Sequence, residues 1–151
     1  MMVDLKRILL VEDNHNDVEL TLEALGEHNL ANAVEVARDG EEALDYLYRR
    51  GRFASRPDGN PVAMLLDLKL PKVNGLEVLK AIRSDEGLKL IPVVILTSSR
   101  EEQDLIESYR LGVNAYVVKP VNFDDFMDAV KTLGIFWAII NEPPPGSRGK
   151  E

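Results

Sequence analysis

The sequence predicts an α/β protein in which helices cover both faces of a doubly wound sheet of five parallel strands. Five short, almost entirely apolar runs alternate along the chain with stretches of helical spacing. A strand that is apolar on both faces is typical of a parallel sheet buried between two layers of helices. The chain has 151 residues, 45% of them hydrophobic and 29% charged, which suits one such domain.

The five strands are predicted from runs of four to six residues that are rich in Val, Ile and Leu. The first run, RILLVE, is apolar between its charged first and last residues, so neither of its faces is suited to water. The other four have the same character. We expect the strands at residues 7–12, 34–37, 62–67, 92–97 and 115–118.

The helices are predicted from apolar side chains that recur every three or four residues. In the first helix, Val18, Leu22 and Leu25 recur at i, i+4 and i+7, after a possible N-cap at Asn14 or Asn16. The same periodicity predicts four more helices, around residues 43–47, 76–82, 105–109 and 123–133.

Two segments fall outside this alternation of strands and helices. Residues 49–61 are basic and rich in turn formers, and are predicted to form a long loop before the third strand. Residues 141–151 contain three consecutive prolines with no apolar residue after them, which is typical of a disordered tail. The domain is therefore expected to span residues 1–140.

Composition argues against several classes of protein. Twenty-six acidic residues against 18 basic ones give a net charge of −8, which repels nucleic acid and anionic lipid. The longest apolar runs, such as residues 133–140, are under half of the ~20 residues that cross a bilayer. The chain has no cysteine, which suits a reducing compartment. We expect a cytoplasmic protein that binds neither nucleic acid nor a membrane.

Polar side chains close four of the five predicted strands. Glu12 and Asp13 end the first, Asp67 the third and Thr97 the fourth, and Lys119 follows the fifth. Ligands of open parallel sheets bind outside the carboxyl ends of the strands, so these side chains are expected at one crevice. Three carboxylates with one lysine leave a net charge of −2, which the site must relieve by protonation or by a cation, and Mg²⁺ suits a site with few carboxylates. A carboxylate beside Mg²⁺ can attack phosphorus and form an aspartyl phosphate, which Thr97 and Lys119 could bind.

Four motifs resemble the receiver domain of bacterial response regulators. They are VED at 11–13, LLDLKLPKVNG at 65–75, ILTSS at 95–99 and YVVKP at 116–120. The resemblance covers roughly residues 6–140. It implies a flavodoxin-like (βα)5 receiver fold, as in CheY-like proteins, and a switch in a two-component phosphorelay. A sensor histidine kinase would phosphorylate the chain, which would signal through protein contacts rather than act as an enzyme.

The resemblance also implies a role for each residue of the motifs. Asp67 would be the phosphoacceptor, and Mg²⁺ would be held by Glu12, Asp13, Asp67 and the main-chain carbonyl of Lys69. Thr97 would be the switch hydroxyl and Tyr116 the switch aromatic, while Lys119 would pair with the phosphoryl group. A cis peptide bond is expected before Pro120.

Some features differ from the usual receiver pattern. Glu12 replaces the commoner Asp, and Lys69 adds a second cation beside the phosphoryl group. The long loop at 49–61 and the Phe136-Trp137 pair resemble the small single-domain regulators that are paired with cyanobacterial phytochromes, which implies a light-regulated kinase. Because residues 123–133 already fill one apolar stripe, we expect Tyr116, Phe136 and Trp137 to form a homodimer contact.

Other functions fit the sequence less well. A Mg²⁺-dependent phosphohydrolase with an aspartate nucleophile would want a second acid two residues later, where Lys69 stands. A flavodoxin-like nucleotide-binding domain would want Gly, Ser or Thr after the first strand, where residues 12–17 are largely acidic. A degenerate receiver would usually have lost Asp67 or Lys119. His15 and His28 could suggest phosphohistidine or metal chemistry, but we interpret both as surface residues.

Overall fold

The computed structural model describes residues 7–26, 33–98, 111–113 and 115–133. Five parallel strands form one sheet in the order β2-β1-β3-β4-β5, so the winding reverses between β1 and β3. The predicted doubly wound α/β fold is confirmed, and each strand lies within one residue of its predicted bounds. The strands are β1 (Arg7–Val11), β2 (Ala33–Ala37), β3 (Ala63–Asp67), β4 (Val93–Thr97) and β5 (Ala115–Val118).

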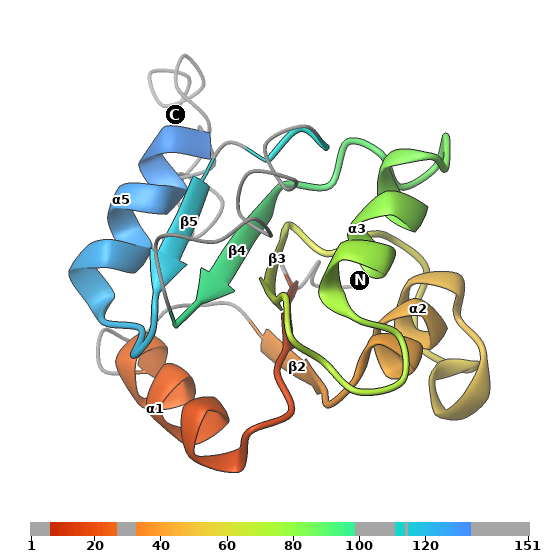
Figure 1. Ribbon diagram of the computed structural model, residues 1–151. Helices are drawn as coiled ribbons and strands as arrows, with labels where there is room; N and C mark the ends of the chain where they lie inside the picture. The colour runs from red at the N-terminus through yellow and green to blue at the C-terminus, as the bar shows by residue number, and fades with distance from the viewer. Residues whose placement is uncertain (1–6, 27–32, 99–110, 114, 134–151) are drawn as a thin grey trace, which may run out of the picture.

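Helices cover both faces of the sheet. Helices α1 (His15–Gly26) and α5 (Phe123–Leu133) lie on one face, and α2 (Gly40–Tyr48) and α3 (Gly75–Arg83) lie on the other (Figure 1). Within the described ranges, no helix is long and apolar enough to span a bilayer. The helix predicted around residues 105–109 lies outside the described residues, as do His28, the Phe136-Trp137 pair and the tail at 141–151.

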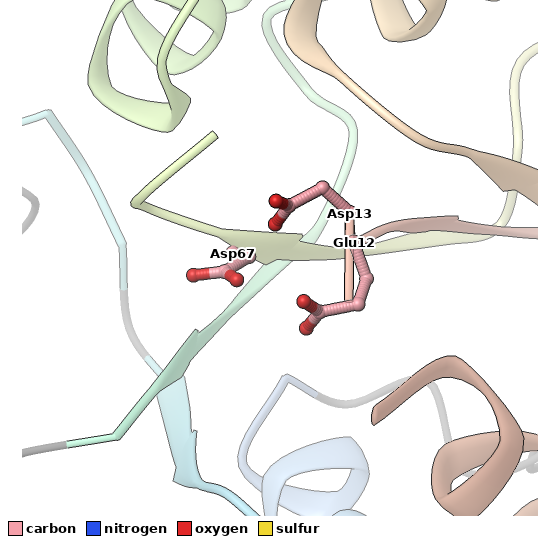
Figure 2. A group of neighbouring side chains, drawn as sticks. All are labelled: Glu12, Asp13 and Asp67. Carbon is pink, nitrogen blue, oxygen red and sulfur yellow. The ribbon is translucent and has the colours of Figure 1, made fainter. Parts of the chain in front are cut away.

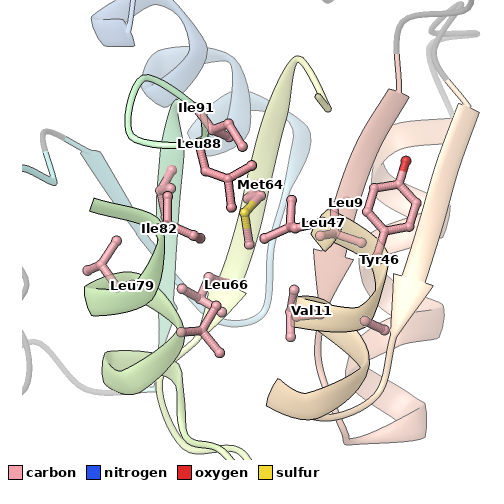
Figure 3. Close-up of a cluster of buried hydrophobic side chains, with 14 of the residues drawn as sticks. Leu9, Val11, Tyr46, Leu47, Met64, Leu66, Leu79, Ile82, Leu88 and Ile91 are labelled. Carbon is pink, nitrogen blue, oxygen red and sulfur yellow. The ribbon is translucent and has the colours of Figure 1, made fainter. Parts of the chain in front are cut away.

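Alternate strand residues enter two separate hydrophobic cores, because successive side chains of a strand point to opposite faces. Leu9, Met64 and Leu66 pack with α2 and α3 (Figure 3). Their neighbours Leu10 and Leu65 pack instead with α1 and α5. The sheet is therefore buried on both sides, which is why its strands read as continuous apolar runs.

Helix α1 begins as predicted but buries a different side chain. The Oδ1 of Asn14 accepts the N–H of Asp17 at 2.9 Å, so Asn14 rather than Asn16 is the cap. Leu22, one of the apolar residues whose spacing predicted the helix, is 36% exposed, and Thr21 is buried with Val18 and Leu25. Both spacings fit a helical face, and the rotation of α1 against the sheet selects Thr21.

The long loop at 49–61 packs against the rest of the domain at several residues and is not exposed to solvent along its whole length. It contains a short 3₁₀ helix, η1 (Gly51–Phe53), and Phe53 is buried edge-on against Tyr46 with ring centroids 5.2 Å apart. Arg52 donates to the carbonyl of Val36 on the edge strand β2 and pairs with Glu42 of α2, both at 3.1 Å. The loop therefore covers part of the sheet edge that β2 would otherwise present to solvent.

Candidate functional site

Three carboxylates meet at the carboxyl ends of β1 and β3, as the sequence predicted. Glu12 and Asp13 follow β1, and Asp67 is the last residue of β3. One carboxylate oxygen from each lies within 4.8 Å of the other two (Figure 2). Glu12 is fully buried, Asp67 is 6% exposed and Asp13 faces solvent. Adjacent strands of the parallel sheet thus bring together residues that are far apart in sequence.

Lys119 joins this cluster from the end of β5. Its Nζ donates hydrogen bonds to Glu12 Oε1, Asp67 Oδ2 and Asp17 Oδ2, each at 3.0 Å. Its backbone N–H donates to the carbonyl of Thr97 at 2.7 Å. The bond from Lys119 to the following proline is cis, as expected. An ammonium has three N–H donors, so the carboxylates engage all of them.

Backbone groups fix the two buried carboxylates. The N–H of Lys69 donates to Asp67 Oδ1 at 3.1 Å, and the N–H of Asn14 donates to Glu12 Oε2 at 3.1 Å. Each acid therefore accepts one bond from the chain just after it and one from Lys119. The main-chain carbonyl of Lys69 as a metal ligand stays a prediction, and the Lys69 side chain is exposed.

The turn after β3 packs closely under Asp67. The N–H of Gly75, the first residue of α3, donates to the carbonyl of Leu68 at 2.9 Å. A Cβ at Gly75 would overlap the carbonyl oxygen of Asp67 and lie 2.6 Å from Leu68 Cα. A side chain larger than hydrogen at Gly75 would therefore displace Asp67 or α3.

The charges of the cluster are strongly coupled. Burial, and after it the charge of Asp67, raise the pKa of Glu12 to about 7, against the opposing effects of Lys119 and of the hydrogen bond from Asn14. Burial by itself would lower the pKa of Lys119, but its hydrogen bonds to Asp67, Asp17 and Glu12 outweigh burial and raise it. These hydrogen bonds favour the charged form of the lysine, and the carboxyl groups around it outnumber this one cation.

Asp17 is a member of this site that the sequence reasoning missed. Its carboxylate is an ion-pair partner of Lys119, and its side chain is 28% exposed. With Asp17 included, four carboxylates and one ammonium carry a formal charge of −3, against the predicted −2. The signal available in the sequence was its spacing, because Asp17 lies four residues after Asp13 in the first turn of the predicted helix.

Thr97 and Tyr116 lie on one face of the sheet. Thr97 is the buried last residue of β4, and Tyr116 of β5 is opposite Ile95. Because Ile95 and Thr97 are two residues apart, they share a face, and Tyr116 packs against the core on that face. His15 is exposed at the start of α1, 3.7 Å from Glu19, in agreement with its interpretation as a surface residue.

The donor set fits a hard divalent cation. Carboxylate oxygens are the ligands that Mg²⁺ and Mn²⁺ prefer, and three of them converge here with excess negative charge. Two of these carboxylates also bond Lys119, so the same acids can serve a metal and an ammonium together.

The chain matches a family model over most of its length. The model of the response regulator receiver domain matches residues 8–131. Response regulator Rcp1 of Synechocystis sp. is 42% identical over 132 residues, which cover 87% of this chain and 88% of Rcp1.

Solved structures of similar proteins have the same fold. The bacteriophytochrome response regulator AtBRR is 61% identical with a TM-score of 0.85, covering 93% of this chain and all of that one. The Mn²⁺-bound form of Rcp1 gives 39% identity and a TM-score of 0.72, over 93% of this chain and 99% of that one. The phosphorylated cyanobacterial phytochrome response regulator RcpA is 42% identical with a TM-score of 0.74, and the match covers 95% of this chain and all of RcpA. The chain therefore belongs to the response regulator receiver domain family, and its relatives are signalling proteins rather than enzymes.

Proposed function

We propose that the chain is a phosphorylation switch whose Asp67 accepts a phosphoryl group from a sensor histidine kinase. The observation that carries this proposal is the hydrogen bond between Asp67 and Lys119 inside a cluster of carboxylates. A buried carboxylate needs a cation nearby to stay ionised and nucleophilic, and Lys119 supplies it. The family membership of the chain supports the same assignment.

The reaction is a transfer between two side chains. A carboxylate oxygen of Asp67 forms a bond to the phosphorus of the kinase phosphohistidine, and the P–N bond breaks. The imidazole nitrogen keeps the electron pair of that bond and can then be protonated. Lys119 pairs with the anionic oxygens of the new aspartyl phosphate, and the hydroxyl of Thr97 donates to one of them.

Mg²⁺ is the proposed cofactor, held by the carboxylates of Glu12, Asp13 and Asp67 and by the main-chain carbonyl of Lys69. When bound, it supplies positive charge that offsets the carboxylates and the incoming phosphoryl group. The convergence of the three carboxylates supports this, as does the Mn²⁺-bound form known for Rcp1.

Phytochrome signalling is the proposed context. Relatives at 61% and 42% identity are named as bacteriophytochrome and cyanobacterial phytochrome response regulators. The phosphodonor would then be a light-regulated histidine kinase in the cytoplasm. Phosphorylation would move Thr97 and Tyr116 and change a protein contact, for which we propose a homodimer through the region of β5 and α5, with Trp137 near the contact. The domain would span residues 1–140, with 141–151 as a tail.

Chemical phosphorylation tests the role of Asp67. Acetyl phosphate with Mg²⁺ is expected to add one base-labile phosphoryl group, measured by intact mass, and Asp67→Asn should abolish it. Asp58→Asn is the matched control, because Asp58 is an exposed aspartate of the 49–61 loop, and should be labelled like the parent. Undiminished labelling of Asp67→Asn would place the acceptor elsewhere.

A further inference from the structure

Asp17 is the third carboxylate on Lys119, and it comes from a different part of the fold than the other two. Glu12 and Asp67 stand at strand ends and are almost fully buried, whereas Asp17 belongs to the first turn of α1 and is 28% exposed. Its backbone is held in place because its N–H bonds the side chain of Asn14 at 2.9 Å. The cap thus fixes the backbone of Asp17, and the carboxylate of the same residue accepts the bond from Lys119 at 3.0 Å.

Asp17 lies outside the group of three carboxylates that we propose to hold Mg²⁺. The three carboxylates that converge within 4.8 Å are those of Glu12, Asp13 and Asp67. Asp17 instead bonds the ammonium at 3.0 Å. It therefore adds negative charge beside Lys119 and uses one of its three N–H donors.

We propose that Asp17 is a positioning residue that competes with the phosphoryl group for Lys119. The inference rests on the proposed phosphorylation of Asp67. Two effects of Asp17 act in the same direction. Its bond holds one N–H donor of Lys119 on the α1 side, and its charge repels the anionic phosphoryl group nearby. The unphosphorylated state of the switch is thereby favoured, and α1 is linked to the end of β5.

Binding of beryllium trifluoride tests this competition without a covalent step. This anion places three electronegative fluorine atoms where the phosphoryl oxygens would lie, and its binding can be followed by ¹⁹F NMR at saturating Mg²⁺, checked for each variant. Asp17→Asn is expected to bind it about fivefold more tightly than the parent, the size expected for loss of one partly exposed charge. Asp17→Glu restores a carboxylate and should return the affinity toward that of the parent.

Glu19→Gln is the matched control, because it removes the same charge from α1 at an exposed position that does not contact Lys119. Its affinity should equal that of the parent. If Asp17→Asn binds beryllium trifluoride no more tightly than the parent, the proposed competition is wrong. It is also wrong if Glu19→Gln gains as much affinity as Asp17→Asn, because that result would indicate a general effect of charge. Asp17→Ser repeats the test if the Asn variant does not fold.

A variant of Asp67 separates this inference from the proposed function. Asp67→Asn should bind no beryllium trifluoride. If it binds like the parent, the acceptor assignment fails and the competition at Asp67 fails with it. If Asp67→Asn loses binding while Asp17→Asn matches the parent, the acceptor stands and only the role of Asp17 is wrong.

Discussion

At the scale of single residues, the ammonium of Lys119 offsets part of the repulsion among the carboxylates of the site. Lys119 bonds Glu12, Asp17 and Asp67, so each buried carboxylate has a partner that offsets part of the cost of its burial. Asp13 differs from them because it faces solvent and is not one of the three carboxylates that accept a hydrogen bond from the ammonium. Its carboxylate adds repulsion without an equal compensation, which a bound cation would supply.

Removal of Asp13 is expected to have opposite effects on metal binding and on stability. Asp13→Ala should weaken Mg²⁺ binding about tenfold or more, because the ion loses a hard charged ligand. It should also raise the melting temperature of the metal-free protein by about 2–4 °C, the shift that relief of ~1 kcal/mol of repulsion produces. Calorimetric titration and thermal unfolding measure the two effects.

Glu23→Ala is the control for Asp13, since it removes an exposed acid of α1 away from the cluster. It should leave Mg²⁺ affinity unchanged. An Asp13→Ala protein that binds Mg²⁺ as the parent does would argue against the proposed ligand set.

At the scale of secondary-structure elements, the tight turn between β3 and α3 positions Asp67. Asp67 is the end of β3, and Gly75 begins α3 against the backbone that immediately follows Asp67. On the other side of the turn, Lys72 has a φ of 65° and lies 3.7 Å from Asp39, the N-cap of α2. The close approach of Gly75 to Asp67 and Leu68 therefore restrains the backbone that carries the acceptor carboxylate.

Gly75→Ala is expected to disturb both stability and the site. The added methyl group would overlap the backbone around Asp67, and we expect a loss of about 1–3 kcal/mol of unfolding free energy, as for other overpacked positions. Labelling by acetyl phosphate should slow as well, because Asp67 shifts. Gly26→Ala is the control, since a Cβ there meets nothing within 4 Å. A melting temperature for Gly75→Ala equal to that of Gly26→Ala would contradict this packing argument.

The whole molecule has two sheet edges that differ in their protection. Arg52 and Glu42 cover part of β2 at one edge. At the other edge, β5 and α5 line a cavity of about 350 Å³ whose wall includes Tyr116, Asp125 and Asp128. The apolar segment 133–140 begins at the last residue of α5. Association at this second edge is therefore the proposed route for the signal.

Sedimentation tests this association. The parent is expected to form a dimer that phosphorylation or beryllium trifluoride shifts by ~1–3 kcal/mol, and Trp137→Ala should weaken it in both states. Leu90→Ala is the control, because Leu90 is 87% exposed before β4. A parent that sediments as a monomer in both states would exclude the dimer.

Much of the fold and of the site followed from the sequence. The strands were found because burial on both faces leaves a continuous apolar run, a local property of each segment. Glu12, Asp13, Asp67, Thr97 and Lys119 were found because the carboxyl ends of parallel strands must meet at one edge. The strands and these site residues could be predicted without knowing any particular contact between residues far apart in the sequence.

Only the tertiary structure shows how a helix is rotated against the sheet and which partner a side chain reaches. Local spacing admitted Leu22 as well as Thr21 on the inner face of α1, and only packing against the sheet selected Thr21. The pairing of Asp17 with Lys119 joins residues 102 positions apart, and no periodicity in the sequence encodes it. Phe53 is buried inside a loop of polar composition because Tyr46 provides a surface for it. Periodicity assigns residues to a face, but the partner of a side chain is fixed only once the elements have packed.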